Sequence, residues 1–206
     1  MIFIASPCGY IINRNFIECR EDAVLWLQNM GYQVVTKLFQ SVNIGMNRNE
    51  ALIEAHHLKA DWLIFIDTDM EFGGNDILAL IRNGGPVVTG VCKTGAGSYA
   101  LYDYENFSNT LTPIKELGPM VDVCGGAFLA IRRSVIEILL QSLNRKWQSV
   151  KVKEIMMDYP FNLVTFMNHF QAGEDTSFCL RLKELGIKIH VAQEAIIGHE
   201  KIVCIK

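Results

Sequence analysis

Hydrophobic and polar residues follow one another in blocks along the first half of the chain, and each block predicts a strand or a helix. Short runs rich in β-branched and aromatic residues favour strands. Segments with apolar residues at helical spacing lie between them, and glycine follows two of these segments as a stop signal. The expected strands are 2–6, 33–39, 62–66 and 87–91, and the expected helices are 19–30, 47–59 and one that Asn75 caps and Gly84 ends.

This alternation indicates the fold class. Strands that alternate with helices favour a largely parallel sheet covered by helices. The chain has 206 residues, half of them hydrophobic, which is enough for one α/β domain with a sizeable core. We therefore expect a single α/β domain over residues 1–206, with a mostly parallel central sheet flanked by helices.

The second half of the chain has weaker periodicity. Glycine, serine, asparagine and tyrosine dominate residues 94–120, which predicts a loop with short antiparallel strands. The other expected elements are a strand over 121–131 broken at Gly125-Gly126, a helix opened by a capping box at Ser134, a helix opened by Glu174-Asp175, and a short strand over 187–191. A regular first half and a mixed second half suggest nucleotide binding by residues 1–93 and acceptor binding by residues 94–206.

Composition excludes some classes of function. The net charge is −3 and no tract rich in lysine or arginine is present, which argues against tight binding to nucleic-acid phosphates. Six cysteines without a CxxC pair indicate reduced thiols, as in a cytoplasmic protein. No apolar run reaches the roughly 18 residues that a membrane-spanning helix needs. Oligomeric state leaves no signal in the sequence.

Asp67-Thr68-Asp69 is the most informative motif, because it follows the apolar run 62–66. Charge at the end of a buried strand is costly unless it is paired or binds a metal. Ligands of open α/β sheets gather at the carboxyl ends of the strands, and residues two apart in an extended segment point the same way. Both carboxylates are thus expected to face a divalent metal with an anionic ligand, most simply a diphosphate. A solvated turn that caps the next helix is the alternative.

Five landmarks in order make the sequence resemble the GT-A glycosyltransferases, in particular the family 2-like group. They are strand 2–6 with Ser6-Pro7, Asn47-Arg48-Asn49 followed by segment 60–70, segment 123–133 with Gly125-Gly126, Glu174-Asp175 followed by Arg181, and the late His199. The resemblance covers most of residues 2–200. It implies the GT-A fold of nucleotide-diphospho-sugar transferases, with a mostly parallel sheet and a small antiparallel part.

The same resemblance implies an activity. Such enzymes move a sugar from a nucleoside-diphosphate sugar, here UDP- rather than GDP-linked, to the hydroxyl of a glycan or other acceptor. It implies Mn²⁺ or Mg²⁺ held by Asp67, Asp69 and His199, and an inverting reaction in which Asp175, beside Glu174, is the general base. Each assignment has a plain alternative: acids at a helix start favour the helix dipole, and a lone histidine is more often a surface residue.

The resemblance also implies a set of donor contacts. Arg48 and Asn49 match a polar pair that lies along the nucleotide, Lys93 is a candidate for a phosphate, and the paired glycines would let backbone approach the sugar. The alternatives are a solvated helix turn and a β-bulge. The full expected set is Pro7, Arg48, Asn49, Asp67, Thr68, Asp69, Lys93, Gly125 and Gly126.

Two other functions compete with this one. A sugar-phosphate nucleotidyltransferase has a related architecture, but such enzymes open with a Gly-rich loop and a basic residue, whereas Gly9 stands alone here. A non-catalytic protein that binds sugar nucleotides or glycans would not need Asp175. Hydride transfer is disfavoured, because no GxGxxG follows the first strand. The short chain also argues against processive polymer synthesis.

Overall fold

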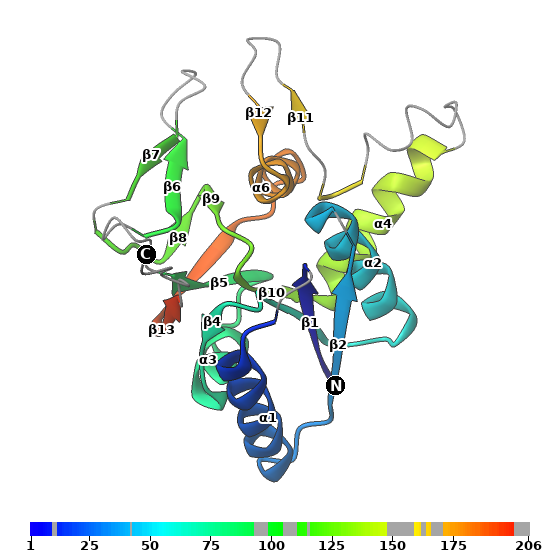
Figure 1. The fold of residues 1–206 in the computed structure, drawn as a ribbon. Helices are drawn as coiled ribbons and strands as arrows, with labels where there is room; N and C mark the ends of the chain where they lie inside the picture. Colours follow the sequence, from blue (N-terminus) through cyan, green and yellow to red (C-terminus); the bar gives the residue numbers. More distant parts are fainter. Residues whose placement is uncertain are drawn as a thin grey trace, which may run out of the picture.

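The computed structural model describes residues 1–9, 12–41, 43–92, 99–104, 111–114, 116–147, 159–161, 164–165 and 171–199. Within these ranges a central sheet of eight strands lies between two layers of helices (Figure 1). The sheet consists, in spatial order, of β2 (Val34–Gln40), β1 (Ile2–Cys8), β3 (Trp62–Ile66), β10 (Phe128–Arg132), β5 (Val87–Cys92), β13 (Ile189–His199) and β4 (Met70–Glu71), with β8 (Met120–Val121) paired to β13.

Strand β10 is the main difference between the observed sheet and the largely parallel sheet that the sequence predicted. Strands β1, β2 and β3 pair in parallel, and so do β5 and β13. The antiparallel β10 lies between β3 and β5 and pairs with both. The expected strand over 121–131 is therefore divided: its last part enters the centre of the sheet, and its first part forms β8 and β9 (Val123–Cys124).

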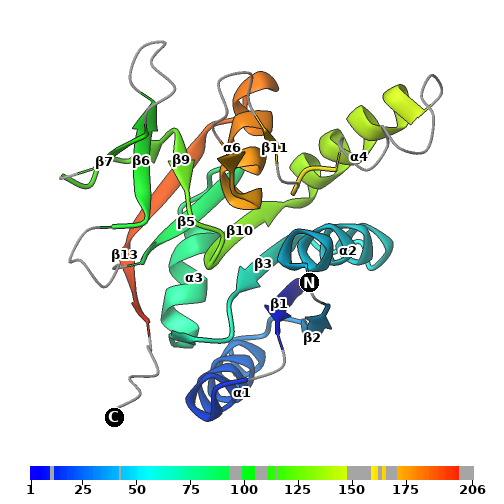
Figure 2. The ribbon, with the colours of Figure 1, turned by 45° about the horizontal axis from the view of Figure 1, so that its top comes forward.

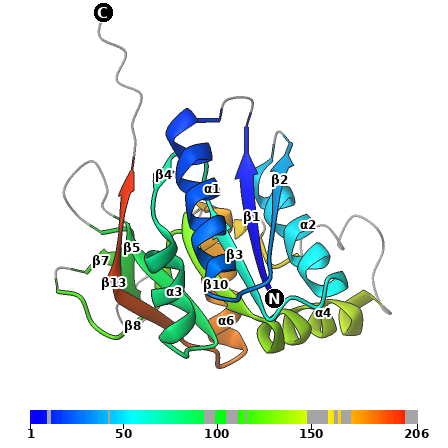
Figure 3. The same ribbon diagram turned by 90° about the horizontal axis from the view of Figure 1, so that it is seen from below.

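The helices form two layers, one on each face of the sheet. Helices α1 (Arg14–Asn29) and α3 (Gly74–Arg82) cover one face, as Figure 3 shows. Helices α2 (Ile44–His57), α4 (Arg133–Trp147) and α6 (Glu174–Glu184) cover the other, as Figure 2 shows.

Side-chain alternation along the strands builds a separate core on each face. Phe3 and Phe65 pack with α2, α4 and α6, whereas Ile4 and Ile64 pack with α1 and α3. Successive residues of a strand point to opposite faces, so continuous apolar runs are needed to fill both cores. Every residue of β1 and of β3 is buried accordingly.

Short antiparallel strands extend from one end of the sheet. Strands β6 (Leu101–Tyr104), β7 (Leu111–Pro113) and β9 form a three-stranded sheet, and β11 (Val164–Thr165) pairs with β12 (Gln171–Ala172). This is the small antiparallel part that the sequence predicted, and the α/β class with its helix-covered sheet is confirmed.

The structure corrects the starts of four helices. Helix α1 begins at Arg14 rather than at 19, and α2 begins at Ile44 rather than at 47. Helix α3 begins at Gly74, so Gly73 and not Asn75 is its cap, and the Asp76 carboxylate accepts the Gly73 N–H at 2.8 Å. Helix α4 begins at Arg133, so Ser134 lies inside it. The Arg133 N–H donates to the carbonyl of Asp61 at 3.0 Å, and the chain passes from β10 into the helix without a serine cap.

The last strand is longer than predicted. It runs from 189 to 199 rather than over 187–191, and it shifts register between Val191 and Ile196. None of the described helices is long and apolar enough to cross a membrane.

Candidate active site

The turn after β3 carries the first pair of acids. The Asp67 N–H donates to the carbonyl of Ala127 on the way into β10, at 2.9 Å, and the Met70 N–H donates back to the Asp67 carbonyl at 3.2 Å. Residues 67–70 therefore form a tight turn, not the extended segment that the sequence predicted. Backbone bonds from both sides fix the position of Asp67 at the carboxyl end of the sheet.

Arg48 lies at the centre of the site and is almost completely buried, with 2% of its side chain exposed. Its Nη2 donates to both carboxylate oxygens of Asp67, at 2.9 and 3.2 Å, and its Nη1 donates to the carboxylate of Glu174. The rings of Phe65 and Phe161 lie with their centroids 5.9 Å from its guanidinium carbon. A buried cation is stable only with such partners.

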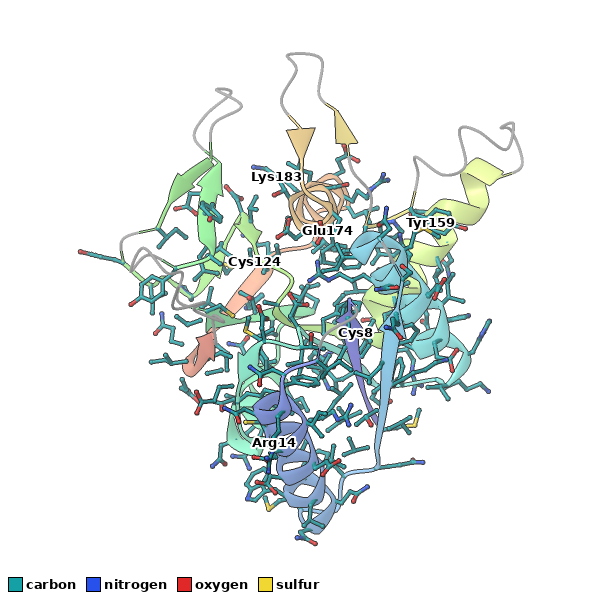
Figure 4. All side chains as sticks on the ribbon, viewed as in Figure 1. Cys8, Arg14, Cys124, Tyr159, Glu174 and Lys183 are labelled. Atoms are coloured by element: carbon teal, nitrogen blue, oxygen red, sulfur yellow. The ribbon has the colours of Figure 1, made fainter. Side chains whose placement is uncertain are left out.

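The second pair of acids opens α6. Gly173 is the N-cap, with extended backbone, and Glu174 and Asp175 occupy the first turn, where the helix dipole favours negative charge. The Asp175 carboxylate also accepts the N–H of Thr176 at 2.7 Å. Figure 4 shows Glu174 at the start of α6, and its contact with Arg48 connects α6 to α2.

Burial and neighbouring charges both shift the pKa values of Asp67 and Arg48. Burial raises the pKa of Asp67 above its ordinary value, and Asp69 and Asp175 raise it further, while Arg48 opposes them. Burial lowers the pKa of Arg48, but Asp67, Glu174 and Asp175 outweigh that effect and raise it. The two directions have different main causes: burial for Asp67, and the surrounding carboxylates for Arg48.

Cys92 also belongs to this region, although sequence reasoning did not select it. It ends β5 at the same edge of the sheet, and burial together with the charges of Asp67 and Asp69 raises the pKa of its thiol to about 12. The only signal in the sequence was its place at the end of a buried strand, which cysteine shares with any small apolar residue.

The side chain of Asn49 forms hydrogen bonds within the protein. Its Nδ2 donates to the carbonyl of Phe161 at 2.7 Å, and its Oδ1 accepts the Phe161 N–H at 3.0 Å. The Phe161 ring stacks on Phe178 of α6, with centroids 4.2 Å apart. Asn49 thus holds the segment 159–161 between α2 and α6, a role that the sequence did not predict. Contact of Asn49 with a nucleotide stays a prediction.

The two glycines after β9 have different neighbours. A Cβ on Gly126 would lie 2.6 Å from the guanidinium carbon of Arg48, so only glycine fits beside that side chain. The Gly125 N–H donates to the carbonyl of Ala100 at 3.0 Å. The group that lies closest to Gly126 is thus Arg48, and approach of a sugar or acceptor to this backbone stays a prediction.

The remaining predicted residues are placed only in part. Pro7 lies near the end of β1, opposite Phe39, and Thr68 lies in the turn of the first acid pair. The backbone of His199 pairs with that of Met70, directly after Asp69. Lys93 lies outside the described residues, and so does the side chain of His199.

A divalent cation fits the chemistry of this site in part. Carboxylate oxygens and imidazole suit manganese, and Asp69 and Asp175 place further negative charge near Asp67, which a cation would offset. Among the described residues no group of three or more histidine, cysteine, aspartate or glutamate side chains is arranged to hold a metal. The pairing of His199 with Met70 brings a third candidate ligand to the first acid pair at the level of the backbone.

Comparison with known proteins was informative only at the level of structure. No protein-family model matches the sequence, and no curated protein is significantly similar to it. Among solved structures, protein A197 from STIV aligns with 100% of this chain and 97% of its own, with a TM-score of 0.57 and 17% identity.

Two glycosyltransferase structures also align. The first is a mutant of Drosophila β-1,4-galactosyltransferase 7 in complex with manganese, UDP-Gal and xylobiose: 94% of this chain, 66% of that chain, a TM-score of 0.50 and 12% identity. The second is a glycosyltransferase involved in the glycosylation of the major capsid of PBCV-1: 100% and 95%, a TM-score of 0.48 and 10% identity. The chain has the GT-A fold.

Proposed function

We propose that this chain is a glycosyltransferase that moves a sugar from a nucleoside-diphosphate sugar to an acceptor hydroxyl. One observation carries the proposal: in a GT-A fold, a buried arginine brings the acids at the end of β3 and at the start of α6 together. Asp67 and Glu174 share the guanidinium of Arg48, and their neighbours Asp69 and Asp175 contribute to the same electrostatic field.

The donor is proposed to bind beside the first acid pair. Asp67, held by Arg48, would face the nucleotide, and Asp69 with His199 would hold Mn²⁺ or Mg²⁺. The galactosyltransferase neighbour was solved with manganese and UDP-Gal, which supports these as the first ligands to test. When bound, the cation neutralises the charge that develops on the diphosphate leaving group.

Asp175 is proposed as the general base. It would take the proton of the acceptor hydroxyl while the hydroxyl oxygen forms a bond to the anomeric carbon of the sugar. The bond from that carbon to the diphosphate breaks on the opposite side, and the nucleoside diphosphate leaves with the electron pair. Such a direct displacement inverts the anomeric configuration. A base in this position contributes about 10²- to 10⁴-fold to the rate.

A thermal-shift screen tests this function. UDP, GDP and UDP-galactose would each be added with manganese chloride and, separately, with a chelator. We expect UDP and UDP-galactose with manganese to raise the melting temperature, because a ligand at 100 times its Kd adds about 2.7 kcal/mol to the free energy of unfolding. A chain that no nucleoside diphosphate stabilises in the presence of metal would contradict the proposal.

The same screen tests His199. His199→Ala should weaken the stabilisation by UDP with manganese more than that with magnesium, because imidazole suits manganese better than the harder ion. His190, which lies at the opposite end of the same strand, provides the matched control as His190→Ala. Equal losses with both metals, or no loss, would exclude His199 as a metal ligand.

A further inference from the structure

We propose that Arg48 is a positioning residue that sets α6 relative to the donor side of the site, with Glu174 as its partner, so that Asp175 and not Glu174 acts on the acceptor. The inference rests on the proposed function and deepens it. It assigns separate tasks to two adjacent acids that the sequence cannot distinguish.

The geometry of the guanidinium supports this task. Arg48 directs Nη2 to Asp67 after β3 and Nη1 to Glu174 on α6, so one planar group joins two elements. Glu174 lies 126 positions further along the chain than Arg48. The guanidinium fork is rigid, with its N–H donors in a fixed plane. Its two contacts therefore restrict the position of Glu174 relative to Asp67.

The surroundings of Arg48 prevent the side chain from moving aside. Gly126 lies against its guanidinium so closely that a Cβ would come within 2.6 Å of Cζ. The rings of Phe65 and Phe161 pack at 5.9 Å, within the range of cation–π attraction. A side chain enclosed in this way loses little further freedom when it holds its two partners.

The contact between α2 and α6 extends beyond Arg48. A Cβ on Gly45 would lie 3.3 Å from Cβ of Glu174 and 2.9 Å from the carbonyl of Phe161, so α2 approaches the start of α6 closely. Phe161, bonded to α2 through Asn49, stacks on Phe178 of α6. The first turn of α6 therefore packs against α2.

The helix geometry then separates the two acids. Adjacent residues of an α-helix point in directions about 100° apart. The carboxylate of Glu174 binds Arg48, whereas that of Asp175 accepts the Thr176 N–H at 2.7 Å. Glu174 is therefore the positioning acid, and Asp175 is the acid available for proton transfer. Misplacement of a catalytic group by about 1 Å can cost on the order of 100-fold in rate.

Hydrogen exchange measured by mass spectrometry tests the positioning without any activity. Arg48→Lys and Glu174→Ala should speed amide exchange in residues 174–179, because lysine cannot fork between two carboxylates and alanine has no carboxylate. Glu174→Gln keeps an oxygen that can accept from Arg48 and should stay close to wild type. Glu184→Ala, at an exposed position of the same helix, is the control. Unchanged exchange in both Arg48→Lys and Glu174→Ala would overturn the proposal.

Kinetics of UDP-galactose hydrolysis in the presence of manganese separate positioning from general structural support. Glu174→Ala should lower kcat by about tenfold or more while KM for UDP-galactose changes less than about threefold, and Glu174→Gln should restore most of kcat. The effects of Arg48→Lys and Glu174→Ala should be non-additive in the double variant, since both act through one contact.

The outcomes distinguish the inference from the function on which it rests. If Glu174→Gln loses as much kcat as Glu174→Ala, Glu174 itself is the base and the positioning role is wrong. If the wild-type chain neither binds UDP nor hydrolyses UDP-galactose, the proposed function fails. The exchange measurement then still decides whether Arg48 positions α6.

Discussion

The two acid pairs of the site are held by different parts of the fold. Asp67 and Asp69 follow a fully buried strand, and a tight turn bonded to β10 fixes the first of them. Glu174 and Asp175 begin a helix, where backbone N–H groups and the helix dipole favour negative charge without a sheet. Arg48 binds one acid from each pair. A strand end and a helix start can therefore supply similar groups to one site when a buried cation joins them.

The largest expected effect concerns Asp67 and Asp69, which we call the strand-end pair. Asp69→Ala should abolish binding of UDP in the presence of manganese, since it removes the carboxylate proposed to hold the metal, while the melting temperature without ligand stays near that of wild type. Isothermal titration calorimetry measures the binding, and Asp22→Ala, at an exposed acid of α1, is the control. Undiminished binding that a chelator does not affect would exclude the metal role of Asp69.

The second-largest expected effect concerns Glu174 and Asp175, which we call the helix-start pair. Asp175→Asn removes the base and keeps its shape, so hydrolysis of UDP-galactose should fall about 100-fold or more while the Kd for UDP with manganese stays nearly constant. This combination would show that the helix-start pair serves the reaction and the strand-end pair serves donor binding. A retained rate would exclude Asp175, and a product with the donor's anomeric configuration would exclude inversion.

A third change concerns the cation between the pairs. Gly126→Ala places a Cβ against the guanidinium of Arg48, which is bonded on both sides and cannot yield. We expect a loss of about 1–3 kcal/mol in the free energy of unfolding, as for other overpacked interiors. Urea denaturation measures it, and Gly9→Ala is the control because nothing lies within 4 Å of its Cβ position. Equal stabilities of the two variants would contradict the close packing.

The smallest expected effect concerns the reactivity of Cys92, which depends on the negative charge of the strand-end pair. The pKa of Cys92 is raised to about 12 by burial, Asp67 and Asp69, so the thiol stays protonated at pH 8 and the thiolate fraction is on the order of 10⁻⁴. Iodoacetamide should therefore modify Cys92 far more slowly than the half-buried Cys19. Asp69→Ala should raise the rate at Cys92 modestly, because it removes one neighbouring charge. Mass spectrometry of the alkylated peptides would detect the difference, and rapid modification of Cys92 at pH 8 would contradict the raised pKa.

Much of the architecture could be predicted from local patterns. The expected helices over 19–30 and 47–59 correspond to α1 and α2, and strand 62–66 has the predicted bounds. The predicted start of α4 was wrong because a hydrogen bond from a distant residue replaced the local cap. The carbonyl of Asp61 accepts the first N–H of α4, so Ser134 is not needed as a cap. The position of β10 in the sheet could not be predicted either, because periodicity shows that a segment is a strand but not which strands it will pair with.

The acids of the candidate site could be named from the sequence, and their roles stay predictions, whereas the burial of its arginine could not be predicted. Asp67 and Asp69 could be selected because charge at the end of a buried strand is costly, whereas Asp175 was selected on the resemblance to glycosyltransferases alone. Arg48 was expected beside a nucleotide, on the first turns of a helix. The structure buries it between Asp67 and Glu174, and no local pattern predicts that a cation near a helix start will be buried.

Local patterns in the sequence are enough to indicate which segments are strands and helices, that helices cover the sheet, and which acids lie at the ends of elements. These properties follow from periodicity and from the cost of burying charge, which act over a few residues. Three features are visible only in the folded chain: β10 separates β3 from β5, Gly126 makes room for Arg48, and Arg48 joins acids from two distant elements. Such contacts depend on packing and charge compensation between residues up to 126 positions apart, and their partners exist only once the chain has folded.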